Sequence, residues 1–429
     1  MSLRRTFLLA VTAVISLALA GCKVSTINYF PPHPAQVRVL NLMVDAPSID
    51  LQVNSAPAFS NVTFQSVTGY QNYDNATTSF AVFLTGSSTP LVSFSYPLAG
   101  EQPYTVLLYG TTLAPQLAMV AEVANAPTNG NIQLSIYNAA QNNGSVDVYV
   151  YPPGTDITTQ NPTFSVVNFG STTFNSSFAP GPYQIQVTTQ GTKTVIYDSG
   201  GSALTPNVAL SLILYPVGSG TLVNAAVLQS KAAMTLLPSI FARVKAVNAA
   251  SGVGPVNQLL GTLQVNLNVS FASASTYTQI PQGLTTVNFE SSATPGATIA
   301  STTTTIPSAS DVSAVVVGQP GSQTAFVLVD QNITPTPGND RLRFVNASPG
   351  SNPVNASANG QQLATNVAFG TASAYAQIPA ATVTVTFTDA TTGAVVASQD
   401  GVVLTLNQTS TIYLIGPPGA QGILVTQDN

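Results

Sequence analysis

Residues 383–388 read Val-Thr-Val-Thr-Phe-Thr, and this alternation of apolar and hydroxylated side chains decides the fold. The same period of two recurs at residues 146–151, Val-Asp-Val-Tyr-Val-Tyr, and at residues 183–188, Tyr-Gln-Ile-Gln-Val-Thr. Alternation that includes β-branched and aromatic residues is typical of strands with one buried face. Pro and Gly at residues 152–154 and 417–419 mark turns between such segments. The pattern predicts an all-β protein.

The chain contains four copies of one unit, each anchored on an Asn that ends an apolar opening. The anchors lie 97, 110 and 98 positions apart and are Asn41, Asn138, Asn248 and Asn346. A second block, Val367-Ala368-Phe369 in the last copy, follows the anchor by 21 residues in three copies and arrives eight residues late in the second copy. Several short strands within about 100 residues predict an antiparallel, immunoglobulin-like β-sandwich in each copy.

Boundaries are expected where Pro, Asn and Gly interrupt the strand pattern. The short linkers favour an extended rod of four modules, and the apolar residues 232–237 are a candidate for packing between neighbours. The predicted organisation is a signal peptide at 1–21, a lipidated Cys with a tether at 22–35, and tandem β-sandwiches at 36–124, 131–230, 240–330 and 340–429.

Cys22 is the only cysteine of the chain and stands at the end of the apolar run of residues 7–20. A basic start, a short apolar stretch and small residues before the cut are the layout of a secretory signal. The run is too short to cross a bilayer of about 30 Å as a helix. With Leu19, Ala20 and Gly21 before it, Cys22 resembles the lipobox of bacterial lipoproteins.

That resemblance implies that Cys22 becomes the first residue of the mature chain and carries acyl chains. Each buried methylene contributes about 0.8 kcal/mol, and two or more chains hold a protein stably on a membrane. Lys23 follows, where lipoproteins retained in the inner membrane typically carry Asp, so outer-membrane delivery is expected by resemblance. An ordinary secretory signal with a chance cysteine is the alternative. Residues 4–8 also resemble the core of a twin-arginine signal, but the general secretory route is favoured, because no cofactor site requires folding before export.

Composition excludes several classes of function. Charged residues make up 6% of the 429 residues, against about 25% in an average soluble domain. Of the 10 basic residues, Arg4 and Arg5 lie in the signal, so 8 remain against 15 acidic residues, a net charge of −7. Nucleic-acid binding lacks its basic footprint. One His and one Cys cannot form a disulfide or a multi-ligand thiolate or imidazole metal site, and no cofactor is expected.

Catalytic residues are not evident. The only histidine, His33, lies in the proline-rich tether, where it is expected to be a solvated linker residue and not a catalytic base. A glycan hydrolase would need a pair of carboxylates at a suitable separation. Glu101, Glu122 and Glu290 stand at different places in their repeats, so such an enzyme is kept only as the alternative to a non-catalytic protein.

Nine residues after each anchor stands an Asp or Asn, namely Asp50, Asp147, Asn257 and Asn355. Asp50 and Asp147 could ligate a cation such as Ca²⁺, which needs several oxygen ligands. An Asx side chain could instead bond backbone N–H groups and fix the turn into the next strand. The structural interpretation is favoured, because two copies lack the charge and no Asp-x-Asp cluster surrounds any of the four positions.

The eight extra residues of the second repeat fall around residues 151–162 and predict a protruding loop. Variable loops on rigid scaffolds often bind partners, so Tyr151 and Asp156 are the candidate binding residues. A tolerated insertion without function is the competing explanation. Tyr277 and Tyr375 each stand two residues before Gln-Ile-Pro, and this repetition favours core or corner residues over sugar-stacking platforms.

Residues 343–349, Arg-Phe-Val-Asn-Ala-Ser-Pro, together with residues 366–370 and 375–379, resemble a bacterial extracytoplasmic repeat family known as domain of unknown function 4397. Residues 45–54, with Asp-Ala-Pro before a strand, match its other hallmark. The resemblance implies secretion, a sandwich-like fold and tandem copies, and offers no catalytic residues.

Together these features predict a lipid-anchored envelope protein that acts as a non-catalytic spacer or as a binding or adhesion module. Uncharged loops rich in amide and hydroxyl groups suit a polysaccharide or an envelope or extracellular protein as partner. The membrane is reached through the lipid anchor alone.

Overall fold

The structure is a computed structural model that describes residues 33–428 except 47, 124–126, 128–129, 205 and 219. The predicted signal with Leu19, Ala20, Gly21 and Cys22 lies outside the described residues. Within the described part, no helix is both long and apolar enough to span a bilayer.

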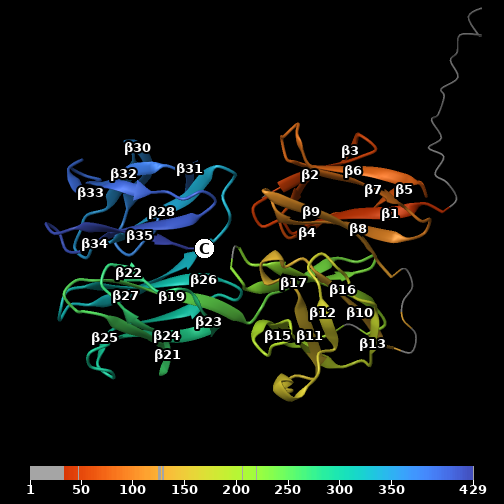
Figure 1. Ribbon diagram of the computed structural model, residues 1–429, viewed down its shortest axis with the longest axis horizontal. Helices are drawn as coiled ribbons and strands as arrows, with labels where there is room; N and C mark the ends of the chain where they lie inside the picture. Colours follow the sequence, from red (N-terminus) through yellow and green to blue (C-terminus); the bar gives the residue numbers. More distant parts are fainter. Residues whose placement is uncertain are drawn as a thin grey trace, which may run out of the picture.

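The predicted all-β architecture of repeated sandwiches is confirmed (Figure 1). Repeat 1 contains β1 (Ala35–Asn41), β2 (Ser48–Val53), β3 (Ala56–Thr63), β4 (Ser66–Val67), β5 (Gln71–Tyr73), β6 (Thr77–Leu84), β7 (Pro90–Pro97), β8 (Pro103–Thr111) and β9 (Ala114–Ala121). Repeat 2 contains β10 (Ile132–Asn138), the 3-10 turn η1 (Gln141–Asn143), β11 (Val146–Tyr151), the 3-10 turn η2 (Ile157–Thr159), β12 (Phe164–Val167), β13 (Ser176–Phe178), β14 (Pro182–Thr189), β15 (Val195–Ala203), β16 (Ala209–Pro216), β17 (Val223–Gln229) and β18 (Met234–Leu237).

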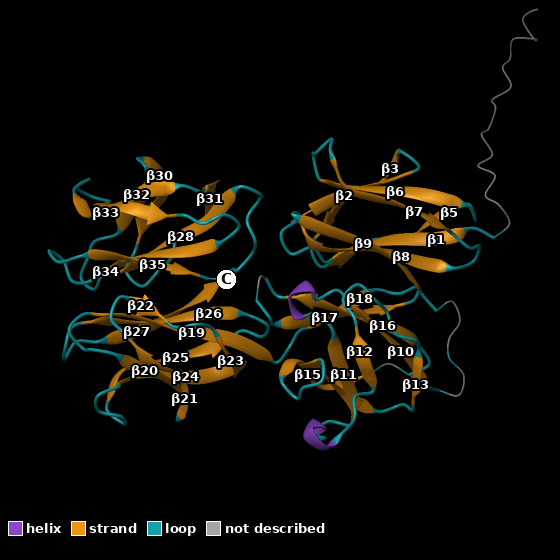
Figure 2. Ribbon diagram, in the orientation of Figure 1, coloured by secondary structure: helices purple, strands orange, loops and turns teal. Residues whose placement is uncertain are grey.

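The second half of the chain repeats this order, without helical turns among its described residues (Figure 2). Repeat 3 contains β19 (Phe241–Ala250), β20 (Val256–Leu260), β21 (Leu263–Val269), β22 (Ser273–Ala274), β23 (Thr278–Pro281), β24 (Gly283–Ser291), β25 (Thr298–Ile306), β26 (Asp311–Gly318) and β27 (Thr324–Asp330). Repeat 4 contains β28 (Asn339–Ala347), β29 (Val354–Ala358), β30 (Gln361–Val367), β31 (Ala376–Pro379), β32 (Thr382–Asp389), β33 (Val395–Val403), β34 (Thr409–Ile415) and β35 (Gly422–Gln427).

Each repeat is a sandwich of two sheets. In repeat 4 the outer sheet has the order β30-β29-β32-β33 and the inner sheet the order β31-β28-β34-β35. The alternation of β32 places Val383, Val385 and Phe387 in the core between the sheets, where they are buried. The first strand of each repeat pairs parallel with a late strand of the same repeat, β1 with β8, β10 with β16, β19 with β26 and β28 with β34. The hairpin neighbours pair antiparallel, as β34 does with β35.

The inner sheets are buried on both faces, because they also pack against each other. Residues of β8, β26 and β34 are buried along the whole strand. Leu107 and Ile213 belong to one apolar cluster between repeats 1 and 2, and Val315 and Tyr413 belong to another between repeats 3 and 4. The expected extended rod is therefore wrong. The repeats form two stacked pairs that lie beside each other (Figure 1).

The chain passes from repeat 2 to repeat 3 just after β18. This strand extends the inner sheet of repeat 2 past residue 230 by pairing with β17. Beyond it, Ile240 N donates to Asp198 O at 2.9 Å, and Gln279 Nε2 donates to Val195 O at 3.1 Å. Residues 232–237 themselves face repeat 1, because Ala232 O accepts from Arg38 and Met234 packs against the apolar cluster between repeats 1 and 2.

The anchoring Asn of every repeat is fully buried and makes the same three hydrogen bonds. In repeat 4, Asn346 Nδ2 donates to Asn352 O and Val367 O, each at 3.2 Å, and its Oδ1 accepts from Ser348 N at 3.2 Å. These bonds hold the segment that crosses from the inner sheet to the outer sheet against the end of the edge strand β30. Asn41, Asn138 and Asn248 make equivalent sets.

Replacing Asn346 with Ala should lower the free energy of unfolding of repeat 4 by about 2 to 4 kcal/mol, because buried backbone groups lose their partners. Hydrogen exchange of the β28 and β34 amides measures this loss. Gln362→Ala, at an exposed position on β30, is the matched control and should leave exchange unchanged. Equal exchange in the two variants would contradict the role assigned to the anchor.

Candidate functional site

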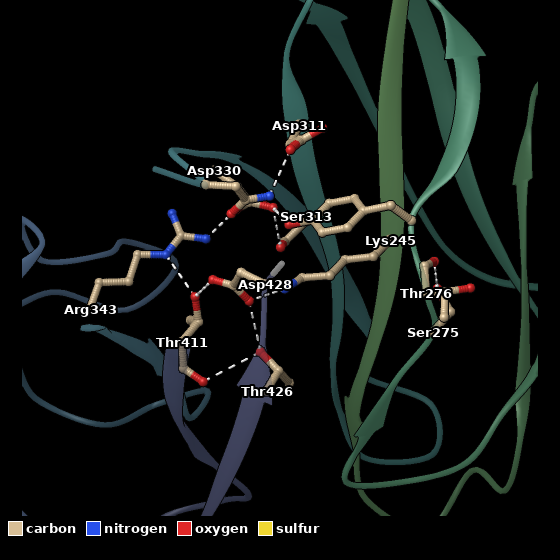
Figure 3. A network of polar contacts seen from close by, with 12 residues as sticks. Lys245, Ser275, Thr276, Asp311, Ser313, Asp330, Arg343, Thr411, Thr426 and Asp428 are labelled. Atoms are coloured by element: carbon tan, nitrogen blue, oxygen red, sulfur yellow. Dashed lines mark hydrogen bonds and ion pairs between the residues drawn. The ribbon is translucent and has the colours of Figure 1, made fainter. Parts of the chain in front are cut away.

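A network of buried charges joins the inner sheets of repeats 3 and 4 (Figure 3). Lys245 on β19 pairs with Asp428, which follows β35, and Arg343 on β28 pairs with Asp330 at the end of β27. Each cation therefore takes its carboxylate from the other repeat. None of the four side chains is more than 3% exposed.

Hydroxyl groups complete the surroundings of both carboxylates. Asp330 Oδ2 accepts from Ser313 Oγ at 2.7 Å and from the hydroxyl of Tyr277 at 2.5 Å. Asp428 Oδ2 accepts from Thr411 Oγ1, which in turn accepts from Arg343 Nε at 3.0 Å. Buried carboxylates that receive several hydrogen bonds recover part of the solvation that they lose on burial.

The two tyrosines that the sequence assigned to core or corner positions cover the cations of the network. The ring of Tyr277 lies 5.1 Å from Lys245 Nζ, and the ring of Tyr375 lies 5.1 Å from Arg343 Cζ. Both distances are within the range of a cation–π interaction. These tyrosines therefore serve the joint between repeats.

Burial and neighbouring charges move the pKa values of Lys245 and Tyr277 in the network. Burial opposes a charge on Lys245, but Asp428 and other nearby groups hold its pKa above the ordinary value. Burial, followed by the charge of Asp330, raises the pKa of Tyr277 far above that of a free phenol. General acid–base catalysis needs a group with a pKa near the working pH. The arrangement suits a structural joint more than proton transfer.

The same positions carry a related cluster in repeat 1. Arg38, like Lys245 and Arg343, stands three residues before its anchoring Asn. Its guanidinium pairs with Glu122 at 3.0 Å, donates to Thr105 Oγ1 at 3.0 Å and lies 4.7 Å from the ring of Tyr70. Arg38 also donates to Gln229 O and Ala232 O of repeat 2, so this ion pair too lies at the joint between repeats.

Repeat 2 carries a neutral version of this cluster. The strand register places Ser135, Ser211 and Ser230 where repeat 1 has Arg38, Thr105 and Glu122. The hydroxyls of Ser135 and Ser211 lie 3.0 Å apart. The joint between repeats 1 and 2 is therefore built with one ion pair, and that between repeats 3 and 4 with two exchanged pairs.

The Asp or Asn at the ninth position fixes a bulge in the neighbouring edge strand and not the turn into the following strand. Its side-chain Oδ1 accepts a hydrogen bond of 2.7 to 3.0 Å from the N–H of a residue with φ between 52° and 54°. Left-handed residues of this kind are typical of β-bulges. The donor and acceptor pairs are Asn61 and Asp50, Val166 and Asp147, Asn268 and Asn257, and Asn366 and Asn355.

The candidate binding loop of repeat 2 uses its polar groups internally. The hydroxyl of Tyr151 donates to Asn161 O at 2.8 Å. Asp156 Oδ1 accepts from Thr158 N at 2.9 Å and from Thr158 Oγ1 at 2.7 Å, which caps η2 and lowers the pKa of Asp156. Ile157 is buried beneath the loop. The loop protrudes as an ordered turn (Figure 2).

The carboxylates weighed for hydrolysis lie in three separate places. Glu122 belongs to the Arg38 pair, and Glu290 Oε2 accepts from Gly296 N at 3.0 Å on the outer sheet of repeat 3. Glu101 is exposed and pairs with the exposed His33. Across the described ranges, no three His, Cys, Asp or Glu side chains gather in a way that could hold a metal ion.

A pocket of about 320 Å³ opens on the outer sheet of repeat 1, between β2, β3 and β6. This volume is at the small end for ligand sites. Sequence reasoning missed the pocket, because its shape depends on the edge strand β3 and on the turn that follows β6. Its lining includes Asp50, Gln52, Pro57, Ser60, Phe83 and Ser87.

A family model described as a domain of unknown function (DUF4397) matches residues 35–149, 242–357 and 341–429, which is more than half of the chain. No curated protein matches the chain.

Three solved structures are similar at low identity. The Bacillus anthracis TIE protein is 9% identical with a TM-score of 0.16, over 87% of this chain and 68% of its own. Alpha-glucan-recognising family 41 carbohydrate-binding modules from streptococcal virulence factors are 8% identical with a TM-score of 0.14, over 45% and 96%. The glycogen-degrading pneumococcal virulence factor SpuA is 8% identical with a TM-score of 0.17, over 85% and 37%. These TM-scores are too low to bear on function.

Lys245→Met should lower the free energy of unfolding by about 3 to 5 kcal/mol, because it leaves Asp428 buried without its cation. Lys245→Met combined with Asp428→Leu should recover most of that loss, since both charges are then gone. Urea unfolding of the two variants measures the difference. Lys231→Met removes an exposed ammonium and is the control; a single Lys245 variant as stable as this control would refute the joint.

Proposed function

The chain belongs to the DUF4397 family of domains of unknown function, and we propose that it is a lipid-anchored, non-catalytic spacer and binding module of the bacterial envelope. The observation that carries the proposal is that three buried ion pairs, Arg38–Glu122, Lys245–Asp428 and Arg343–Asp330, lie at the joints between repeats. Charges that face another repeat, and not solvent, hold domains together. A spacer needs such joints, whereas a catalytic site needs its reactive groups within reach of a substrate.

The paired repeats support a rigid spacer. Within each pair the inner sheets share an apolar cluster, and residues from both repeats contribute to it. Apolar burial of this kind stabilises at about 25 cal/mol for each Å² removed from water. Sliding or bending at these joints would expose the clusters and break ion pairs, so each pair should behave as one body.

The uncharged surface supports a binding role for polysaccharide or for an envelope or extracellular protein. Because only 6% of the residues are charged, recognition would rest on amide, hydroxyl and aromatic groups. Such contacts are screened little by salt. The pocket of repeat 1 offers groups of all three kinds next to one carboxylate.

The alternative of a glycan hydrolase is not favoured by the placement of its candidate carboxylates. A retaining or inverting pair would have to lie on either side of one scissile bond. Glu101, Glu122 and Glu290 instead stand in separate environments, two of them engaged in bonds that shape the fold or the joint. We therefore assign no enzymatic activity to the chain.

Replacing Cys22 with Ser should move the protein from the detergent phase to the aqueous phase in a detergent phase-partition experiment, because the hydroxyl cannot receive the diacylglycerol. The unmodified chain is the control and should partition with detergent. A Cys22→Ser protein that still enters the detergent phase would refute the lipid anchor. Protease accessibility on intact cells then decides which side of the outer membrane the repeats occupy.

The soluble fragment that begins at Lys23 should bind glycans on an array without hydrolysing them, and binding of uncharged glycans should change little between 50 and 500 mM salt. A hydrolysis assay on the bound glycans is the control for the enzymatic alternative. Release of product would overturn the non-catalytic proposal. Absence of binding to any glycan would direct the search to protein partners.

A further inference from the structure

Asp50, which lines the pocket of repeat 1, has one more oxygen than its structural role requires. Its Oδ1 accepts from Asn61 N at 2.7 Å and from Thr85 Oγ1 at 3.0 Å. Asn257 and Asn355 perform the same role in repeats 3 and 4 with a single amide oxygen. No donor in the described part of the chain bonds Asp50 Oδ2. The second oxygen and the negative charge are therefore surplus to the fold.

The residue opposite Asp50 also differs between repeats. The register of β2 with β6 places Phe83 directly across from Asp50, and Phe83 lines the same pocket. In repeat 2 the position opposite Asp147 is a threonine, and Asp147 Oδ2 is occupied by Gly191 N at 2.8 Å. The residues opposite the ninth position in repeats 2, 3 and 4 are Thr188, Glu290 and Thr388. A free carboxylate oxygen beside a phenyl ring thus occurs in repeat 1 alone among the four.

The charge of the pocket points to a cationic ligand. No Lys, Arg or His is among the described residues that line it, and the whole chain has a formal net charge of −5. A carboxylate makes strong, charge-assisted hydrogen bonds with an ammonium group, and an aromatic ring attracts the same cation. A calcium ion is a poorer fit, because it needs six to eight oxygen ligands and the lining offers one carboxylate.

The neutral polar residues that line the pocket indicate that the cationic group belongs to a molecule with hydroxyl groups. Gln52, Ser60 and Ser87 offer an amide and two hydroxyls around the pocket, which can pair with sugar hydroxyls in either direction. The volume of about 320 Å³ suits one ring and not a longer chain.

We propose that the pocket of repeat 1 binds the ammonium group of an unacetylated amino sugar, with Asp50 Oδ2 as acceptor and Phe83 as the aromatic wall. This inference rests on the proposed binding function and names its ligand chemistry.

The chain itself supplies the test variants, because Asn and Thr occupy the two positions in other repeats. Asp50→Asn keeps the acceptor for Asn61 N and removes the charge, and Phe83→Thr copies repeats 2 and 4. Asp400→Asn removes a charge from the outer sheet of repeat 4 and is the matched control. Isothermal titration of the full chain in mild detergent uses glucosamine, N-acetylglucosamine and cadaverine as probes, with thermal unfolding as the check on folding.

Glucosamine should bind at least tenfold more tightly than N-acetylglucosamine or cadaverine. Asp50→Asn should weaken it at least fivefold at unchanged thermal stability, and Asp400→Asn should leave it unchanged. Phe83→Thr should also weaken it at least fivefold, with a lower unfolding temperature because the ring is buried, so its titration is made well below that temperature. Equal binding of the acetylated sugar would overturn the ammonium site, and equal binding of cadaverine would overturn the sugar carrier. Failure of glucosamine to bind, while the soluble fragment still retains glycans on the array, would overturn the pocket and leave the proposed function standing.

Discussion

The structure depends on the burial of each inner sheet from both sides. One face of β26 or β34 belongs to the core of its own repeat, and the other face meets the neighbouring repeat. A strand covered on both sides needs apolar residues at successive positions, which is why β26 carries Val315-Val316-Val317 whereas β32 alternates. The polar residues that remain in these strands must find partners across the joint. The exchanged pairs of Lys245 and Arg343 follow from that requirement.

Much of the fold could be predicted from the sequence, because its signals are local or recur. The period of two predicts the outer strands, and the anchoring Asn marks the same crossing four times. The pairing of repeats could not be predicted by the same route. Continuous apolar strands indicate two covered faces but do not say what covers the second one, and the rod was inferred from linker length alone. The basic residue three positions before the anchor was visible in Arg38, Lys245 and Arg343, yet its partner stands far away in sequence.

The candidate site, like the fold, could be predicted from the sequence only in part. Recurrence of Asp or Asn at the ninth position indicates a structural side chain, and it does bond backbone N–H groups. Which N–H it bonds depends on strand register and on a bulge at Asn61 or its equivalents, and neither can be derived from residue types. The pocket beside Asp50 requires three strands and a turn to meet, so composition could not reveal it. The comparison between repeats reveals it, because Phe83 departs from the residues at matching positions.

In repeat 2, Ser135, Ser211 and Ser230 replace the charged cluster of repeat 1, which shows that the joint of a pair tolerates different polar residues. The pairing itself limits how the number of repeats can change. In a single repeat the second face of the inner sheet is a broad apolar surface that another repeat covers. Left exposed, such a surface promotes aggregation. Gain or loss of one repeat would expose the apolar face of one inner sheet to solvent, whereas gain or loss of a pair of repeats would not. Proteins of this architecture should therefore gain or lose repeats in pairs. Each pair can differ in how many ion pairs and how many hydroxyl groups its joint contains.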